Sequence, residues 1–123
     1  MKILIVDDST FMRTILKNII HGSKFADADI IEASNGNEAV TKYAAEKPDL
    51  ILLDIIMPGK DGMTVLKEVG PAARSVIIIS SIDQPQVIDQ AKSLGAKGYI
   101  VKPYDASEVL TMLESVSSEH TSG

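Results

Sequence analysis

The segment "KPDLILLDIIMP" (47–58) places an acidic side chain directly after an apolar run. Leu50–Leu53 has the composition of a strand buried on both faces, and Asp54 follows it without a break. An unpaired carboxylate inside a protein core costs several kcal/mol of free energy. Asp54 therefore either ends the strand in solvent or belongs to a site that the strand supports, and this segment alone does not separate the two interpretations.

The length and composition fit a small protein of the cytoplasm. The 123 residues predict one domain over 1–118 and a short, frayed polar tail over 119–123. There is no cysteine, which excludes disulfides and thiolate metal sites. The net charge of −5 disfavours nucleic acid or a membrane as partner, and no apolar run approaches the ~20 residues of a membrane span. We expect a cytoplasmic monomer that binds other proteins.

Short apolar runs alternate with segments of helical period along the whole chain. The runs that predict strands cover 2–6, 28–33, 50–53, 76–79 and 99–101. Between them, apolar residues recur at intervals of three and four, as on one face of a helix. Gly22 and Gly95 are expected to end the first and fourth helices, and Asp105 with Glu108 three residues on is expected to cap the start of the last one. Strands that are apolar on both sides and joined by helices favour a parallel sheet covered on both faces. The predicted fold class is α/β, a doubly wound (βα)5 fold with a five-stranded parallel sheet.

Polar side chains follow four of these strands. They are Asp7 and Asp8 after the first strand, Asp54 after the third, Ser80 after the fourth and Lys102 after the fifth. Each has an ordinary explanation on its own, as a helix cap, a turn residue or a solvated surface residue. The carboxyl ends of parallel strands, however, share one edge of a sheet, where ligands bind. The joint placement of all five residues favours a site.

Three carboxylates at one edge of a sheet repel one another. A like-charged pair about 4 Å apart costs ~4 kcal/mol at an effective dielectric constant near 20, and either a proton or a divalent cation relieves it. Ligands that are all oxygen suit Mg²⁺. A hard cation, a hydroxyl group and an ammonium group around a carboxylate suit a phosphoryl group. With no cysteine and both histidines elsewhere, the nucleophile at the centre is an aspartate.

Four motifs occur in order along the chain: "ILIVDDS" (3–9), "DLILLDIIMPGKDG" (49–62), "VIIISS" (76–81) and "GYIVKP" (98–103). Asp54 and Ser80 are 26 residues apart, and Ser80 and Lys102 are 22 residues apart. On these motifs the chain, from Ile3 to about Ser117, resembles the receiver domains of two-component response regulators, and among them the CheY-like chemotaxis regulators. The resemblance implies a flavodoxin-like, CheY-like sheet with the strand order 2-1-3-4-5.

The resemblance also implies an acceptor and a metal site. Asp54 is expected to receive a phosphoryl group as an acyl phosphate and to be a ligand of Mg²⁺. Asp8 is expected to bind the ion directly and Asp7 mostly through water, with the backbone carbonyl of Ile56 as a further ligand.

A second set of residues is implied to detect the phosphate. Ser80 is expected to move toward the phosphoryl group and Tyr99 to swing into the space that it leaves. Lys102 is expected to pair with a phosphoryl oxygen, and the Lys102–Pro103 peptide bond is expected to be cis, which X–Pro bonds adopt at a cost of only ~0.5–1 kcal/mol.

The function that follows from the resemblance is that of a stand-alone signalling switch. A histidine kinase of the CheA type would phosphorylate Asp54, and the surface of the fourth helix, fifth strand and fifth helix would then bind a motor-switch protein or another target. A phosphatase is a further expected partner. The protein would not be an enzyme, apart from Mg²⁺-dependent self-phosphorylation and self-dephosphorylation. The alternative is a phosphorelay intermediate or phosphate sink of another two-component pathway.

Three other classes fit the sequence less well. Phosphatases of the haloacid dehalogenase type have a second aspartate two residues after the nucleophile, where this chain has Ile56. Dinucleotide-binding domains carry G-x-G-x-x-G after the first strand, where this chain has "DDSTFM". A receiver domain that has lost phosphorylation would lack residues that are all present here.

Two apolar residues depart from a common pattern of the receiver family. Ile56 lies two residues beyond Asp54, and Ile82 lies two residues beyond Ser80. In receiver domains these side chains flank the path of the attacking water, and many members have polar residues there. We therefore hypothesise that self-dephosphorylation is slow in this protein.

Overall fold

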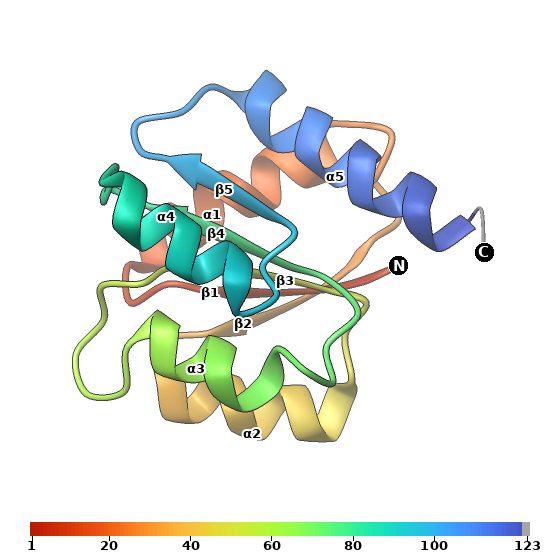
Figure 1. The fold of residues 1–123 in the computed structure, drawn as a ribbon. Helices are drawn as coiled ribbons and strands as arrows, with labels where there is room; N and C mark the ends of the chain where they lie inside the picture. The colour runs from red at the N-terminus through yellow and green to blue at the C-terminus, as the bar shows by residue number, and fades with distance from the viewer. Residues whose placement is uncertain (122–123) are drawn as a thin grey trace.

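The structure, a computed structural model, describes residues 1–121. Strands and helices alternate along them, in the order β1 (Lys2–Val6), α1 (Thr10–His21), β2 (Asp29–Ala33), α2 (Gly36–Glu46), β3 (Leu50–Leu53), α3 (Gly62–Val69), β4 (Val76–Ser80), α4 (Pro85–Ser93), β5 (Gly98–Val101) and α5 (Ala106–Thr121). All neighbouring strands are parallel, in the order β2-β1-β3-β4-β5 (Figure 1). The predicted fold class and strand order are confirmed.

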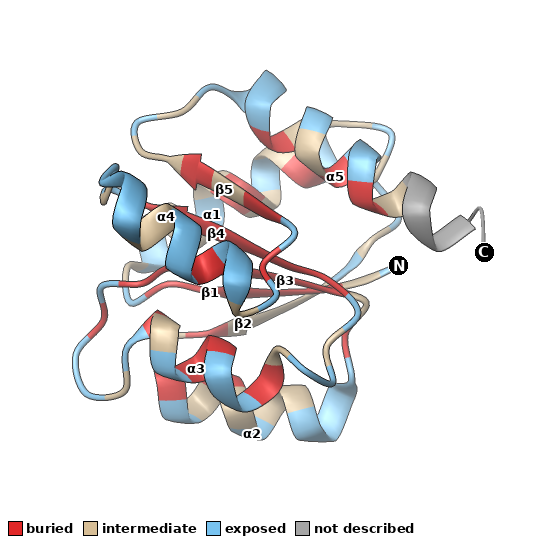
Figure 2. Ribbon diagram, in the orientation of Figure 1, coloured by how far each residue is buried: buried red, intermediate tan, exposed pale blue. Residues whose placement is uncertain are grey.

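The helices form two layers, one on each face of the sheet. Alternate residues of β3 point to opposite faces. Ile51 and Leu53 pack in a core cluster with residues of α2, α3 and α4, whereas Leu50 and Leu52 pack in a second cluster with residues of α1 and α5. All four are at most 1% exposed, and the buried residues follow the strands and the inner sides of the helices (Figure 2). Burial on both faces explains why the strands are apolar throughout.

Several helix boundaries follow from local capping. The Ser9 hydroxyl accepts a hydrogen bond from the Met12 N–H at the start of α1, and Gly22 ends that helix as expected. Before α5, the Asp105 carboxylate accepts from the Glu108 N–H at 3.0 Å, and the Glu108 carboxylate accepts from the Asp105 N–H at 3.4 Å. This reciprocal pair confirms the predicted capping box.

The remaining boundaries differ from the prediction by one or two residues. Ser80 is the last residue of β4 and does not follow it, and β2 begins at Asp29 and β5 at Gly98. Helix α4 ends at Ser93, before Gly95, which has a φ of 109°. The predicted frayed tail over 119–123 includes residues 122–123, which lie outside the described residues, and stays a prediction.

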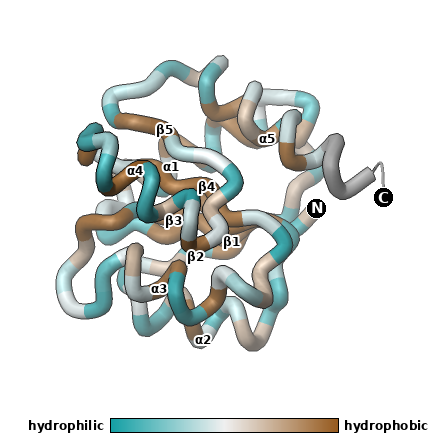
Figure 3. Tube along the Cα trace, viewed as in Figure 1, coloured by the Kyte–Doolittle hydropathy of each residue, from teal (hydrophilic) through white to brown (hydrophobic). Residues whose placement is uncertain are grey.

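Hydropathy follows the layers of the fold. The most hydrophobic segments are the inner strands, and the hydrophilic ones lie on the outer turns of the helices (Figure 3). Among residues 1–121, no helix has both the length and the apolar character that crossing a bilayer requires.

One glycine allows the start of α3 to approach the end of β3. A Cβ atom on Gly62 would lie 2.1 Å from the carbonyl oxygen of Asp54, much closer than any side chain tolerates. The Gly62 N–H donates to the carbonyl of Ile55 at 2.8 Å. The loop after β3 is therefore folded back tightly beside Asp54, and glycine is the residue that permits it.

Candidate functional site

The carboxyl ends of β1, β3 and β5 bring three charged side chains together. Lys102, directly after β5, has its Nζ 3.1 Å from Oδ2 of Asp7 and 3.5 Å from Oδ2 of Asp54. Asp7 and Asp54 directly follow the paired strands β1 and β3. The lysine side chain reaches past the end of β4 to both, because β4 lies between β3 and β5. Residues that are 95 and 48 positions apart in the chain thus form one ion-pair cluster.

Three carboxylates lie close enough to share a metal ion. Asp7, Asp8 and Asp54 each offer one oxygen, and these atoms lie within 4.8 Å of one another. Asp7 and Asp54 are 3% and 7% exposed, whereas Asp8 is exposed. Carboxylate oxygens with one open side fit Mg²⁺, which prefers oxygen and keeps several waters. A single ammonium group does not balance three carboxylates, so a divalent cation also fits the charge.

The environment of Asp54 makes its ionised form costly. Burial raises the pKa of Asp54; the charge of Lys102 lowers it, and the charge of Asp7 raises it again, so that the pKa is raised overall. A cation bound by the carboxylates would favour the ionised form, because opposite charge within a few Å stabilises a carboxylate.

Asp7 and Asp8 differ in how firmly the protein holds them. Asp7 donates its N–H to Ala33 at 3.1 Å, and its Oδ1 accepts from the Ser9 N–H at 2.9 Å. Its Oδ2 faces Lys102. The Asp8 carboxylate has no hydrogen bond or ion pair with any residue in the described part of the chain. Asp8 is thus the carboxylate that is free to bind an ion from the solvent side.

Ser80 and Tyr99 are joined through the backbone of one residue. The buried Ser80 hydroxyl accepts a hydrogen bond from the Ile82 N–H at 3.1 Å. The half-buried Tyr99 hydroxyl donates to the Ile82 carbonyl at 2.6 Å. Burial raises the pKa of Tyr99, so its hydroxyl stays a donor at neutral pH. A displacement of Ser80 would therefore reach Tyr99 through Ile82.

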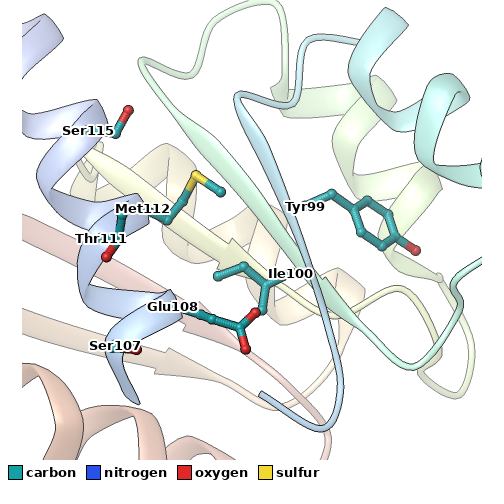
Figure 4. A pocket seen from close by; sticks show the side chains of 7 residues that line it. All are labelled: Tyr99, Ile100, Ser107, Glu108, Thr111, Met112 and Ser115. Carbon is teal, nitrogen blue, oxygen red and sulfur yellow. The ribbon is translucent and has the colours of Figure 1, made fainter. Parts of the chain in front are cut away.

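Behind Tyr99, β5 and α5 enclose a surface hollow of about 460 Å³. Its lining residues are Tyr99, Ile100, Ser107, Glu108, Thr111, Met112 and Ser115. The Tyr99 ring points to the other side of β5 from the α5 side chains (Figure 4). The Tyr99 ring thus lies on the side of β5 where its hydroxyl reaches Ile82, and the side chains of α5 line the hollow on the other side.

Every residue predicted for the site lies at this edge of the sheet or beside it, and the Lys102–Pro103 bond is cis as expected. Three contacts of the site residues were not predicted from the sequence. They come from the Ser9 N–H, from the backbone of Ile82, of which only the side chain was considered, and from Arg13, which contacts the Asp7 carbonyl. Hydrogen bonds from backbone groups cannot be predicted from residue types, because every residue carries the same backbone. Arg13 resembled an ordinary charged residue on the outer face of a helix.

Comparison with known families agrees with this geometry. The family described as "Response regulator receiver domain" matches residues 3–114. The chain belongs to this family. The match includes the three carboxylates of the site, Ser80, Tyr99 and Lys102.

Known receiver proteins match over nearly the whole chain. The chemotaxis protein CheY of Listeria monocytogenes is 45% identical over 120 residues, which cover 95% of this chain and 98% of that protein. CheY of Thermotoga maritima is 42% identical, covering 94% and 97%. A solved structure of a CheX–CheY complex with BeF3 and Mg²⁺ from Borrelia burgdorferi has a TM-score of 0.85 at 40% identity, covering 94% of this chain and 87% of that chain. This receiver domain is therefore CheY-like.

The raised pKa of Asp54 leads to a prediction for stability. Without Mg²⁺, the Asp54→Asn variant should be more stable than the unmodified protein at pH 7, by on the order of 1 kcal/mol. A raised pKa means that the folded state binds the proton at a higher pH than the unfolded state. The advantage of asparagine should therefore shrink as the pH falls through the raised pKa toward the ordinary range.

Chemical denaturation of both proteins between pH 4 and pH 8 in EDTA measures this difference. Asp27→Asn, which removes an exposed acid outside the cluster, is the control and should change stability little. The prediction would be contradicted if Asp54→Asn and the unmodified protein were equally stable at pH 7, or if the difference between them did not change with pH.

Proposed function

We propose that this CheY-like receiver domain is a phosphorylation switch that accepts a phosphoryl group on Asp54 and then binds a target protein. The observation that carries this function is the convergence of three carboxylates and Lys102 at the carboxyl edge of the sheet. The donor is proposed to be a histidine kinase of the CheA type. The protein is thus proposed to be a cytoplasmic, monomeric switch and not an enzyme, apart from the slow reactions of its own phosphate.

The proposed transfer uses Asp54 as nucleophile. An oxygen of Asp54 attacks the phosphorus of a phosphohistidine, the O–P bond forms, and the N–P bond breaks with its electron pair left on the imidazole. When bound, Mg²⁺ supplies positive charge for the carboxylates and the phosphoryl oxygens. Asp8, Asp7 and the backbone carbonyl of Ile56 are proposed to hold the ion.

Lys102 is proposed to change partners during this transfer. Its ammonium group is shared between Asp7 and Asp54 in the structure, and the contact with Asp54 is the longer one, at 3.5 Å. Once Asp54 is an acyl phosphate, its charge lies on the phosphoryl oxygens, which are the stronger acceptors for an ammonium donor. Lys102 is proposed to pair with one of them and so to stabilise the phosphorylated form.

Detection of the phosphate is proposed to begin at Ser80. Its hydroxyl would leave the Ile82 N–H and donate to a phosphoryl oxygen. The Ile82 segment, released from Ser80, would then be free to move together with Tyr99, which is hydrogen-bonded to the Ile82 carbonyl. The contact of Ser80 with the phosphoryl oxygen exists only in the phosphorylated protein, so it favours one arrangement over the other, which a population shift requires.

The output surface is proposed to consist of α4, β5 and α5. Tyr99 belongs to β5, and its ring packs against the core cluster that contains Ala91 of α4, so movement of this ring is proposed to change the surface offered to a partner. The names of the relatives support a role in chemotaxis. The target is proposed to be a motor-switch protein. The CheX–CheY complex shows that one CheY binds another protein, and a phosphatase is proposed as a further partner here. A phosphorelay intermediate or phosphate sink remains the alternative role.

Acetyl phosphate with Mg²⁺ should add one phosphoryl group to this protein, as measured by intact mass spectrometry with peptide mapping to Asp54. Asp54→Asn should block the addition because it removes the nucleophile, and EDTA should slow it because the carboxylates then lose their counter-ion. Asp27→Asn serves as the control and should react normally. Equal phosphorylation of the Asp54→Asn and unmodified proteins would refute the proposed function.

The lifetime of the phosphate should depend on Ile56 and Ile82. Ile56 is 57% exposed beside Asp54, and Ile82 is half-buried above Ser80, so neither side chain can orient an attacking water. The double variant Ile56→Asn, Ile82→Glu should lose phosphate faster, by roughly tenfold or more, because positioned polar groups assist water attack.

Decay of the phosphorylated proteins after removal of acetyl phosphate gives this rate. Phe11→Gln, which makes another exposed apolar residue polar, should keep the slow rate. A double variant that decays no faster than the unmodified protein would show that these residues do not control the lifetime.

Activation should change the α4–β5–α5 surface at a distance from the phosphate. Beryllium fluoride with Mg²⁺ should shift the NMR amide resonances of Ser80, Ile82, Tyr99 and α5 more than those of α2, because α2 has no part in the proposed relay. The same addition to Asp54→Asn should cause no such shifts. Shifts confined to the loops around Asp54 would contradict coupling to this surface.

A separate binding experiment tests the target. The activated form should bind motor-switch proteins if one of them is the target.

A further inference from the structure

We propose that Arg13 is a positioning residue that sets the direction of the Asp8 carboxylate by holding the backbone carbonyl of Asp7. The inference rests on the Mg²⁺ site of the proposed function and deepens it. Arg13 is the fourth residue of α1, and its side chain is only 11% exposed. So deep a burial of a guanidinium group calls for defined partners.

The guanidinium group of Arg13 makes three contacts in three directions. Nη1 donates to the Asp7 carbonyl at 2.5 Å, Nη2 to the Thr10 hydroxyl at 3.1 Å, and Nε to the Glu32 carboxylate at 3.0 Å. A planar group held at all three nitrogens has little freedom to rotate. Arg13 therefore ties the end of β1 to the start of α1 and to β2.

The Asp7 carbonyl needs such a partner. The last pairs of β1 join Val6 to Ala33 and to Leu53, so the Asp7 carbonyl lies beyond the ladder while its side chain is buried. An unpaired carbonyl in such a place costs free energy comparable to a lost hydrogen bond. The hydrogen bond from Arg13 satisfies it and fixes its direction.

Fixing this carbonyl also fixes Asp8. The Asp7 carbonyl and the Asp8 N–H belong to one planar peptide unit, so the direction of the carbonyl sets where the Asp8 side chain starts. The Asp8 side chain has no hydrogen bond or ion pair of its own within residues 1–121. The backbone is then the main constraint on the direction of the Asp8 carboxylate. Arg13 holds that backbone through its hydrogen bond to the Asp7 carbonyl.

Glu32 anchors Arg13 from the neighbouring strand. Its second carboxylate oxygen accepts from Lys17 at 3.1 Å. Burial raises the pKa of Glu32, but the hydrogen bonds and charges of Lys17 and Arg13 outweigh it and lower the pKa overall. Glu32 thus stays ionised and holds the guanidinium group in place. Lys17 binds the same carboxylate, and within residues 1–121 it has no hydrogen bond or ion pair with Asp7 or Asp8.

Charge and geometry predict opposite effects of Arg13 on Mg²⁺ affinity. A cation beside the carboxylates repels a second cation, so if Arg13 acted only by its charge, its removal would tighten Mg²⁺ binding. If Arg13 acts by positioning, its removal weakens binding although a positive charge is lost. Arg13→Lys keeps the charge, and a single ammonium group cannot reproduce three divergent hydrogen bonds.

Isothermal titration calorimetry with MgCl2 on the full chain distinguishes the two. Arg13→Lys and the neutral Arg13→Gln should each weaken Mg²⁺ binding, by roughly tenfold to 100-fold, the usual effect of losing a residue that orients a metal ligand. Lys17→Met is the matched control: it removes a positive charge from the same carboxylate of Glu32 and should leave Mg²⁺ affinity equal or tighter.

A second readout separates positioning from general damage to the fold. Phosphorylation of Arg13→Lys by acetyl phosphate should need more Mg²⁺ for half-maximal rate, and saturating Mg²⁺ should restore the rate close to that of the unmodified protein. Thermal unfolding in EDTA confirms that each variant is folded. Arg13→Gln provides the same comparison if Arg13→Lys does not fold.

Three outcomes would overturn the inference. They are Mg²⁺ binding by Arg13→Lys equal to that of the unmodified protein, tighter binding by Arg13→Gln, and equal weakening by Lys17→Met. If the unmodified protein itself bound no Mg²⁺, the proposed function would fail as well. Failure of Arg13 alone leaves the unmodified protein binding Mg²⁺, so the two failures are distinguishable.

Discussion

The repulsion between carboxylates at the ends of β1 and β3 is the constraint on which the site depends. Asp7 and Asp54 are nearly buried and share one ammonium group, that of Lys102, while Asp8 adds a third negative charge from the solvent side. A like-charged pair at about 4 Å costs ~4 kcal/mol at an effective dielectric near 20. Because of this cost, positive charge near the three carboxylates stabilises the site. Lys102 supplies part of it, and a proton or a bound cation can supply the rest.

The rest of the fold holds that unfavourable arrangement in place. Each fully buried leucine or isoleucine contributes ~1.5–3 kcal/mol, and the four residues of β3 are buried on both faces. Their burial outweighs the cost of ending the strand in a carboxylate. Gly62 then allows α3 to begin against the Asp54 backbone, so Asp54 lies at a rigid strand end beside a tightly folded loop.

The hydrogen bonds around the site divide it into fixed and movable parts. Asp7 is held through its N–H, its carbonyl and both carboxylate oxygens. Asp8 is open to solvent, and the contacts of Ser80 and Tyr99 both pass through the Ile82 backbone. Under the proposed function, a phosphoryl group on Asp54 would change the contacts of Ser80 and Lys102, including the contact of Lys102 with Oδ2 of Asp7. The contacts of the Asp7 N–H, carbonyl and Oδ1 involve neither residue. This division suits a switch, because one set of contacts can change while the other is kept.

The sequence by itself determined the order of strands and helices, the parallel sheet and the identity of the charged residues, because burial on both faces leaves continuous apolar runs and strand ends carry polar residues. It also indicated the α5 capping pair, since that contact is local. The tertiary structure decided what depends on distant segments or on the backbone: the length of the Lys102 contacts, the Ile82 link and the hold of Arg13 on Asp7. Such contacts have no period or spacing in a sequence, because folding alone brings their partners together.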